Sequence, residues 1–140
     1  MTSTLEYSIS AQRVNENESR AFCKGAEIVL DTAMAGRQDA FNPAELFLAS
    51  IAACMLKGIE RVSPLLQFSL RGVNIKVHGV RLDNPPRMIR ITYEILVDTD
   101  EPDHRLNLLH ENVRKFGTIS NTVALACPLT GTLTRRISQL

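Results

Sequence analysis

The chemistry of this 140-residue chain centres on its cysteines, which are its strongest nucleophiles. They are Cys23, Cys54 and Cys127. A thiol reacts as the thiolate, and because a free cysteine has a pKa of about 8.5, a reactive one needs a positive group nearby. Cys54 has two candidates for that group. Lys57 would share its face of a helix, since it stands three residues on, and Arg37 precedes the apolar stretch that holds Cys54.

A thiolate at position 54 would attack the distal oxygen of a hydroperoxide and become a sulfenic acid, which a second thiol resolves. The apolar neighbours Phe47, Ile51 and Met55 would then bind the alkyl part of the substrate. A simpler interpretation is that Cys54 is a small core residue, since free cysteine is often fully buried. The residues around Cys54 leave both interpretations open.

The stretch from residue 41 to residue 62 predicts a buried helix that carries Cys54. Asn42 is a favourable N-cap, and Pro43 presets the backbone at the first helical position. Glu45 stands where its carboxylate can reach back to the cap, which completes a capping box. The apolar run is shorter than the roughly 20 residues that cross a bilayer. We expect this helix to end near residues 63–64.

Composition narrows the class of protein. With 44% hydrophobic residues, residues 1–140 have enough apolar material for one domain with a real core. The net charge of +1 and the absence of a basic block disfavour nucleic acid as a partner. An odd number of cysteines and no signal-peptide pattern indicate a cytoplasmic protein. No cofactor motif occurs, and no histidine has metal-ligand spacing; the histidines are His78, His104 and His110.

Alternating apolar and polar residues predict five strands. They cover residues 5–14, 20–31, 73–78, 88–97 and 129–137. The first two would form one antiparallel hairpin and the next two another, with strong turn chemistry at residues 83–86. One apolar face on each strand implies a sheet that packs helices on one side.

Two further helices are expected after the second hairpin. An amphipathic helix starts near Pro102 and reaches Phe116, where Gly117 would act as a left-handed cap. A short helix over residues 119–126 follows, with Thr118 as its cap. His104 and His110 stand six residues apart, do not line up on one helix face, and are both expected to be exposed. The resulting order, β-β-α-β-β-α-α-β, defines an α+β fold of antiparallel hairpins with a buried central helix.

Two motifs carry a resemblance to a known family. The run N-P-x-E-L-F-x-A-x-x-A-A-C ends at Cys54, and G-T-I-S-N-T-V begins at Gly117. Together they resemble the OsmC/Ohr family of thiol peroxidases, which reduce organic hydroperoxides. The resemblance covers nearly the whole chain and implies the OsmC-like fold. It also implies an intertwined homodimer whose central helices pack together, with each active site at the subunit interface.

The resemblance assigns roles to particular residues. Cys54 corresponds to the reactive cysteine. The family's activating arginine lies in the loop before the central helix, which favours Arg37 over the other candidate, Arg20. The family's glutamate stands ten residues before the cysteine, where this chain has Ala44. Glu45 is one position later, about 100° further round the helix, and its capping role explains it without catalysis.

The second cysteine of the peroxidase members is missing from its expected place. Gly117 stands there, and Cys127 is the remaining candidate for a resolving thiol. A helix rises about 1.5 Å per residue, so these two positions can lie more than about 10 Å apart. A disulfide needs Cα atoms within about 7 Å of each other. Cys127 can therefore replace the missing cysteine only if the late helix is short or displaced.

Two functions follow from these residues. The first is a thiol-dependent peroxidase of the one-cysteine type, acting on organic hydroperoxides in oxidative stress defence and reduced by an external thiol. Its catalytic residues would be Cys54, Arg37 and Glu45. The alternative is a non-catalytic dimer that binds an apolar small molecule at the subunit interface. The differences at Gly117 and Ala44 favour the alternative, whereas the intact Cys54 favours the peroxidase. Neither function requires a metal, a cofactor or a membrane.

Overall fold

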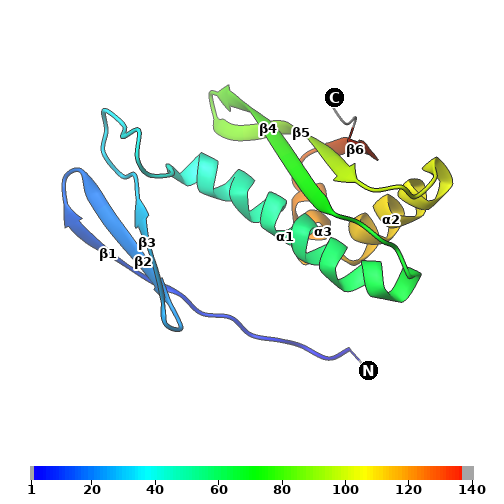
Figure 1. Cartoon of the computed structure of the whole chain (residues 1–140). Coiled ribbons are helices and arrows are strands. Elements are labelled where there is room, and N and C mark those ends of the chain that lie inside the picture. The colour runs from blue at the N-terminus through cyan, green and yellow to red at the C-terminus, as the bar shows by residue number, and fades with distance from the viewer. Residues whose placement is uncertain (1, 137–140) are drawn as a thin grey trace. The chain divides into compact units, whose positions relative to one another are not determined.

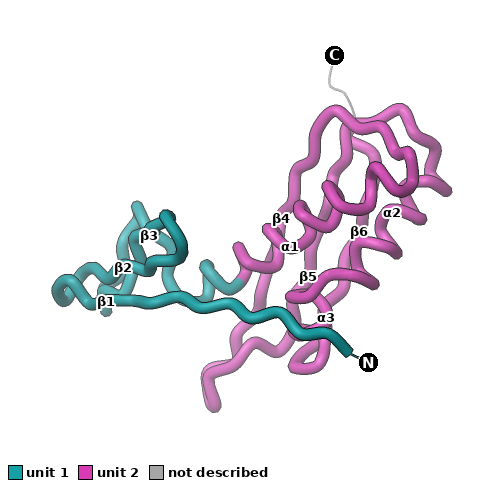
Figure 2. Tube along the Cα trace, turned by 90° about the horizontal axis from the view of Figure 1, so that it is seen from below, with its two compact units in different colours: residues 1–47 teal, residues 48–140 magenta. Residues whose placement is uncertain are grey.

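The computed structural model describes residues 2–136, which form an α+β fold in two compact units. Unit 1 is residues 1–47 and unit 2 is residues 48–140, coloured teal and magenta in Figure 2. The elements are β1 (Ser10–Asn15), β2 (Glu18–Cys23), β3 (Ala26–Leu30), α1 (Pro43–Leu66), β4 (Gly72–Asp83), β5 (Pro86–Asp98), α2 (Asp103–Phe116), α3 (Thr118–Ala124) and β6 (Leu129–Arg135). The α+β class is confirmed, and the grouping of residues 1–140 into one domain stays a prediction.

Unit 1 contains a three-stranded antiparallel sheet in the order β1-β2-β3 (Figure 1). The prediction of one strand over residues 20–31 is wrong, because a tight turn at Lys24 and Gly25 divides it into β2 and β3. Lys24 has φ 57°, a left-handed conformation that residues other than glycine seldom adopt. The element order therefore has one strand more than predicted. The first strand is also shorter than predicted and begins at Ser10.

Helix α1 begins as its sequence predicts. The backbone N–H of Asn42 donates to Glu45 Oε1 at 3.0 Å, and the N–H of Glu45 donates to Asn42 Oδ1 at 2.8 Å. These reciprocal hydrogen bonds are a capping box, which satisfies two of the donors that a helix start leaves unpaired. The predicted capping role of Glu45 is confirmed.

The predicted end of this helix is wrong, because α1 continues through Pro64 to Leu66. Proline removes one helical hydrogen bond, and here it does so in the last turn, where little helix remains to be disturbed. Gln67 then adopts φ 50°, and its N–H donates to the Pro64 carbonyl. The N–H of Phe68 donates to the Ser63 carbonyl at 2.8 Å. This pair of hydrogen bonds is a Schellman motif, which stops the helix.

The sheet of unit 2 has the order β4-β5-β6 (Figure 1). Strands β4 and β5 form the predicted antiparallel hairpin, with Ile75 opposite Ile95. Strand β6 pairs with β5 in parallel, with Tyr93 opposite Gly131. Parallel strands need a crossover connection, and α2 and α3 provide it. Residue 137, the predicted end of the last strand, lies outside the described residues.

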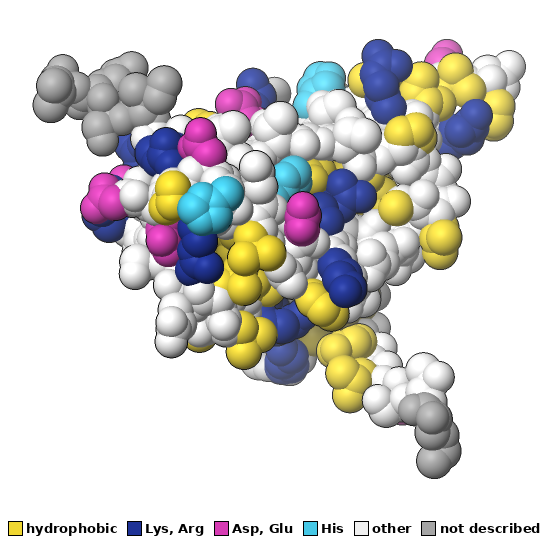
Figure 3. Space-filling model, turned by 90° about the vertical axis from the view of Figure 1, so that its right-hand side faces the viewer, with side chains coloured by type: hydrophobic (Ala, Val, Ile, Leu, Met, Phe, Trp, Pro, Cys, Tyr) yellow, Lys and Arg dark blue, Asp and Glu magenta, His cyan; other side chains and the backbone are white. Residues whose placement is uncertain are grey.

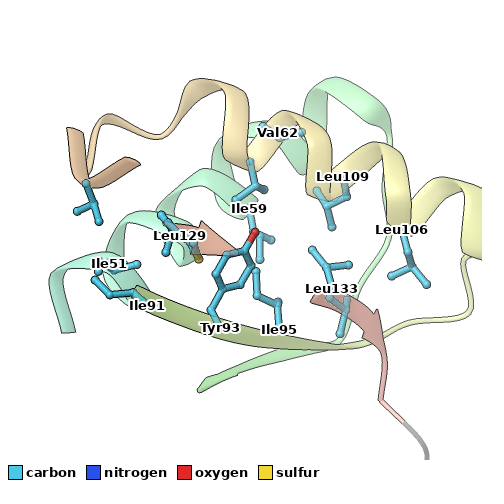
Figure 4. Packing of buried hydrophobic residues seen from close by; sticks show 14 of the residues in the cluster. Ile51, Ile59, Val62, Ile91, Tyr93, Ile95, Leu106, Leu109, Leu129 and Leu133 are labelled. Carbon is cyan, nitrogen blue, oxygen red and sulfur yellow. The ribbon is translucent and has the colours of Figure 1, made fainter. Parts of the chain in front are cut away.

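The hydrophobic core lies between one face of this sheet and the helices. Every second residue of β5 from Ile91 to Val97 is buried, and Figure 4 shows Ile91, Tyr93 and Ile95 meeting side chains of α1 and α2. The fully buried core residues include Ile51, Met55, Ile59, Ile91, Ile95, Leu109, Val97 and Val113. Within residues 2–136 no helix is long and apolar enough to cross a membrane.

The corner between α2 and α3 differs from the prediction in both of its caps. Gly117 has φ −83° and ψ 113°, so it is not a left-handed cap, and it is itself the N-cap of α3 in place of Thr118. The space at this position is tight for any residue larger than glycine. A Cβ at this position would lie 3.1 Å from both the Val113 carbonyl oxygen and Ser120 Oγ, tighter than side chains normally pack.

Candidate thiol site

Cys54 lies at the border of the core-facing side of α1. Ile51 and Met55 beside it are buried at 0% and 1% exposure, whereas Ala53 is exposed. Cys54 itself is half-buried and its thiol is free. The helix therefore leaves Cys54 neither sealed in the core nor fully exposed.

An exposed cation and an exposed apolar side chain follow Cys54 on α1. Lys57 stands three residues later, close to the same helix face, and its side chain is exposed. Leu56 is 41% exposed, which is unusual for a leucine in the middle of a long helix. The surroundings of the thiol within unit 2 thus combine apolar surface with one positive charge.

Arg37 belongs to unit 1, and Asp31 determines the fold of its loop. The buried Asp31 carboxylate accepts hydrogen bonds from the backbone N–H groups of Ala33 at 3.1 Å and of Arg37 at 2.8 Å. Gly36 adopts φ +82° in the turn between them, a conformation that glycine allows without strain. The sequence therefore folds this loop around one carboxylate, which fixes the backbone from which the Arg37 side chain projects.

The guanidinium of Arg37 is held by two carboxylates. It donates to both oxygens of Asp39, at 2.8 and 2.9 Å, and to Glu18 Oε1 at 3.0 Å. These hydrogen bonds lower the pKa of Asp39 and of Glu18, and a bond from Arg20 lowers the pKa of Glu18 further. Both carboxylates consequently stay charged well into the acid range. Arg20, the other candidate, pairs with Glu18 and Glu27.

The remaining predicted residues take different places. Ile51 and Met55 face the core of unit 2, and Phe47 is 39% exposed. Cys127 is buried just after α3, at 8% exposure, where its N–H donates to the Val123 carbonyl; its thiol is free. The thiol of Cys23 donates to the Ser8 carbonyl in unit 1. The roles of these residues in substrate binding or thiol exchange stay predictions.

A second polar cluster in unit 2 was not foreseen from the sequence. The hydroxyl of the buried Tyr93 lies 2.6 Å from His110 Nε2 and accepts a hydrogen bond from Arg114 Nη1 at 3.1 Å. Arg114 Nη1 also donates to the Leu129 carbonyl at 2.9 Å. The predicted exposure of His110 is wrong. A tyrosine on the apolar face of β5 was the available signal, because a buried phenol needs a polar partner.

The surroundings of His110 disfavour its charged form. Burial lowers the pKa of His110 below its usual value, and the charge of Arg114 lowers it further, against a smaller opposing effect of Glu111. The Tyr93 hydroxyl and His110 Nε2 share one hydrogen bond, and the tautomer of His110 determines which of the two is its donor. No group of three or more metal-ligating side chains that could hold an ion occurs within residues 2–136.

Comparison with known proteins agrees with this architecture. Residues 36–132 match the family described as OsmC-like protein. The chain is 26% identical to the hydroperoxide reductase of Mycoplasma genitalium over 134 residues, which cover 91% of this chain and 86% of that protein.

Solved structures show the same fold. An OsmC-like protein from Mycoplasma pneumoniae superposes with a TM-score of 0.84 at 18% identity, covering 95% of this chain and 99% of that one. An organic hydroperoxide resistance protein from Elizabethkingia anophelis gives a TM-score of 0.70 at 18% identity, covering 98% and 100%. The family match spans more than half of the chain. This chain belongs to the OsmC-like family, as its two motifs predict.

Proposed function

We propose that this chain is a thiol-dependent peroxidase that reduces organic hydroperoxides, with Cys54 as its nucleophile. The observation that carries the proposal is a free, half-buried thiol on α1, within the segment that matches the OsmC-like family. A relative with 26% identity is named a hydroperoxide reductase, and a structural neighbour is named an organic hydroperoxide resistance protein. Both names indicate peroxides as the substrate class.

The proposed reaction has two stages. The Cys54 thiolate attacks the distal oxygen of the hydroperoxide, the O–O bond breaks, and the departing alkoxide takes up a proton to become the alcohol. The sulfur is left as a sulfenic acid. An external thiol then displaces water from it to form a mixed disulfide, and a second thiol reduces this disulfide and regenerates Cys54.

Arg37 is the proposed stabiliser of the thiolate, and its ion pairs define what that role requires. Its charge is already compensated by Glu18 and Asp39. To act on Cys54, the guanidinium would exchange part of its contact with one carboxylate for the sulfur. Lys57 provides a second positive charge on α1 itself. In this proposal Glu45 contributes by fixing the start of α1, which follows from its capping box.

The reductant is external in this proposal. Glycine occupies position 117 at a corner too tight for an added side chain without local movement. Cys127, the other candidate, is buried behind α3. Both electrons then come from small thiols or from a dithiol protein.

The proposal includes a homodimer in the cytoplasm. Unit 1 leaves many large apolar side chains in water; they are Leu5, Tyr7, Ile9, Val14, Ile28, Met34, Phe41 and Phe47. An apolar surface of this kind is typical of an interface. A second copy of the chain would cover it, as the family resemblance implies. Sedimentation of the purified chain at micromolar concentration tests this directly, and a monomer at that concentration would refute the dimer.

The peroxidase is tested by consumption of cumene hydroperoxide in the presence of dithiothreitol. Wild type should consume peroxide steadily, and Cys54→Ser should reduce the rate to the level of buffer with reductant alone. Cys127→Ser is the matched control, since it removes another thiol from unit 2 and should keep most of the activity. Equal rates for wild type and Cys54→Ser would refute the peroxidase.

Such a result would favour the alternative function, a non-catalytic dimer that binds an apolar molecule. Gly117 and Ala44, which differ from the family pattern, also favour this alternative.

A second experiment separates the two ways in which the oxidised Cys54 could be reduced. It measures the intact mass of the chain after one equivalent of peroxide, without reductant. A gain of one oxygen that is absent from Cys54→Ser is expected for a one-cysteine mechanism. A loss of two hydrogens would instead show an intramolecular disulfide, and its absence from both Cys54→Ser and Cys127→Ser would show that it joins these two residues.

A further inference from the structure

The cluster of Tyr93, His110 and Arg114 borders a cavity that the proposed peroxidase does not use. The cavity has a volume of about 340 Å³ and is lined by Tyr93, His110, Glu111, Arg114, Leu129, Thr130 and Gly131. This volume lies at the lower end of the range of about 300–1,000 Å³ found for small-molecule sites. Its walls come from β5, α2 and β6, all within unit 2.

Arg114 is anchored at one nitrogen only. Its Nη1 donates to the Tyr93 hydroxyl and to the Leu129 carbonyl, which uses both hydrogens of that nitrogen. A guanidinium has five donors. Its remaining three, on Nε and Nη2, have no hydrogen-bond partner within residues 2–136, and no carboxylate in that range lies within ion-pair distance of Arg114.

The anchoring also orients the group. The guanidinium carbon lies 5.7 Å from the centre of the Tyr93 ring, and the ring of His110 meets the same tyrosine edge-on at 5.6 Å. Figure 4 shows the Tyr93 hydroxyl directed away from its strand toward the helices. A planar cation held in place with two adjacent nitrogens unsatisfied matches the geometry of a carboxylate, which accepts two parallel hydrogen bonds.

The shape of the cavity depends on the absence of a side chain at Gly131. A Cβ there would overlap the carbonyl oxygen and the ring of Tyr93, so only glycine fits opposite this tyrosine. Gly131 also borders a second hollow, of about 440 Å³, on the face of the sheet that carries Lys76, His78 and Thr132. In Figure 3 histidine, basic and acidic side chains lie among hydrophobic ones on the face turned to the viewer.

We propose that this cavity is a binding site for a small organic carboxylate, with the Nε and Nη2 edge of Arg114 as its anion-binding group. Thr130 and Gly131 of β6 also line the cavity, and Leu129 and the Tyr93 ring offer apolar surface for the rest of the ligand. Glu111 lines the same cavity and opposes a negative charge, so the site favours one carboxylate over ligands of higher negative charge. This site is independent of the reaction at Cys54.

Benzoate is the probe, because it joins one carboxylate to a small apolar body. The backbone amide signals of Thr130 and Gly131 are followed by NMR in the ¹⁵N-labelled full chain, during a titration at constant ionic strength and pH 7.5. We expect a saturable shift of both signals with benzoate. Benzamide has the same shape without the charge and should give no saturable shift.

Three substitutions on α2 then have different expected effects. Arg114→Gln should weaken benzoate binding by about tenfold or more, since hydrogen bonds to a charged group contribute about 1.5–3 kcal/mol. Glu111→Gln should tighten it, because a like charge is removed. Lys115→Gln is the control. It removes a neighbouring positive charge on the same helix, outside the cavity lining, and should leave the affinity unchanged.

Absence of a saturable shift with wild type and benzoate would overturn the proposal. Equal binding of benzamide would also overturn it, because the charge of the ligand would then not contribute to binding. Equal losses of affinity for Arg114→Gln and Lys115→Gln would overturn it as well, because they would show a general effect of net charge. If Arg114→Gln fails to fold, the comparison of benzoate with benzamide in wild type and the direction of the Glu111→Gln effect still decide the matter.

Discussion

Different interactions stabilise unit 1 and unit 2, each taken by itself. Every residue of the buried apolar core lies in unit 2, whereas the buried residues of unit 1, Ser19 and Asp31, are polar. Unit 1 relies on backbone pairing, on the loop hydrogen bonds of Asp31, and on ion pairs of Arg20 and Arg37. Exposed ion pairs contribute little to stability, whereas apolar burial contributes most of it.

This difference indicates where each unit obtains its stability. A three-stranded sheet without an apolar core of its own needs another surface to be stable. Unit 2 has an apolar core of its own. The proposed homodimer would supply that surface for the exposed apolar side chains of unit 1, and the substitutions below test this contrast between the units.

The largest effect is expected from a cavity in the core of unit 2. Ile95 is fully buried, so Ile95→Ala should lower the free energy of unfolding by about 2–5 kcal/mol. Ile28 in unit 1 is 46% exposed, and Ile28→Ala should cost less than about 0.5 kcal/mol if its surroundings stay in water. Urea denaturation followed by circular dichroism measures both. A large Ile28→Ala cost that depends on protein concentration would show that a second copy covers it.

A smaller loss of stability is expected at Gly131, where the sheet of unit 2 has no space for a side chain. Gly131→Ala places a methyl group against the backbone and ring of Tyr93, and such overpacking typically costs about 1–3 kcal/mol. Gly72→Ala is the matched control on β4, where an added Cβ meets nothing within 4 Å. Thermal unfolding compares them. If Gly131→Ala were as stable as Gly72→Ala, the close approach of β6 to Tyr93 would be disproved.

Substitutions in the capping box at the start of α1 should have the next largest effect on stability. Asn42→Ala removes the side-chain cap and should cost about 1 kcal/mol. Glu45→Gln should cost much less, because glutamine can still bond the Asn42 N–H in a capping box. Urea denaturation gives the stabilities, and the cumene hydroperoxide assay gives the activities. A Glu45→Gln variant that is stable but inactive would contradict the purely structural role of Glu45.

The smallest effect concerns pH. Because the pKa of His110 is lowered in the folded state, the unfolded chain takes up more protons as the pH falls through about 6.5, the usual histidine value. The stability of wild type should therefore decrease between about pH 7 and pH 5. His110→Gln should show a weaker decrease, whereas His104→Gln, at an exposed position, should follow wild type. Melting temperatures across this range supply the measurement, and parallel curves for His110→Gln and wild type would contradict the assignment.

Local chemistry predicted much of the fold. Asn42, Pro43 and Glu45 determine the start of α1 through contacts three residues apart, and these can be read directly from the sequence. The β4–β5 hairpin follows from alternation and turn residues. The turn at Lys24 was missed because no glycine stands at its left-handed position, and the extension past Pro64 was missed because a proline in a last turn is tolerated.

The two candidate sites also differ in how far the sequence could predict them. Cys54 could be selected because the motif and the residue coincide in sequence. The cluster of Tyr93, His110 and Arg114 could not, since it joins β5 to α2 and depends on a parallel strand pairing that no local pattern predicts. One signal was present: His110 and Arg114 stand four residues apart, beside the apolar stripe of α2, so both lie near the core face of that helix.

The parallel pairing of β6 with β5 also has a consequence for how the chain acquires its structure. The β4–β5 hairpin closes within a few residues, whereas β6 can join the sheet only after residues 99–128 have been made and have coiled into their two helices. Contacts between distant segments slow folding, because the loop entropy is lost before the contacts form. During synthesis, the edge of β5 that later pairs with β6 therefore stays unpaired until the chain beyond residue 128 has been made, and until then it is open to capture by a chaperone or by another chain.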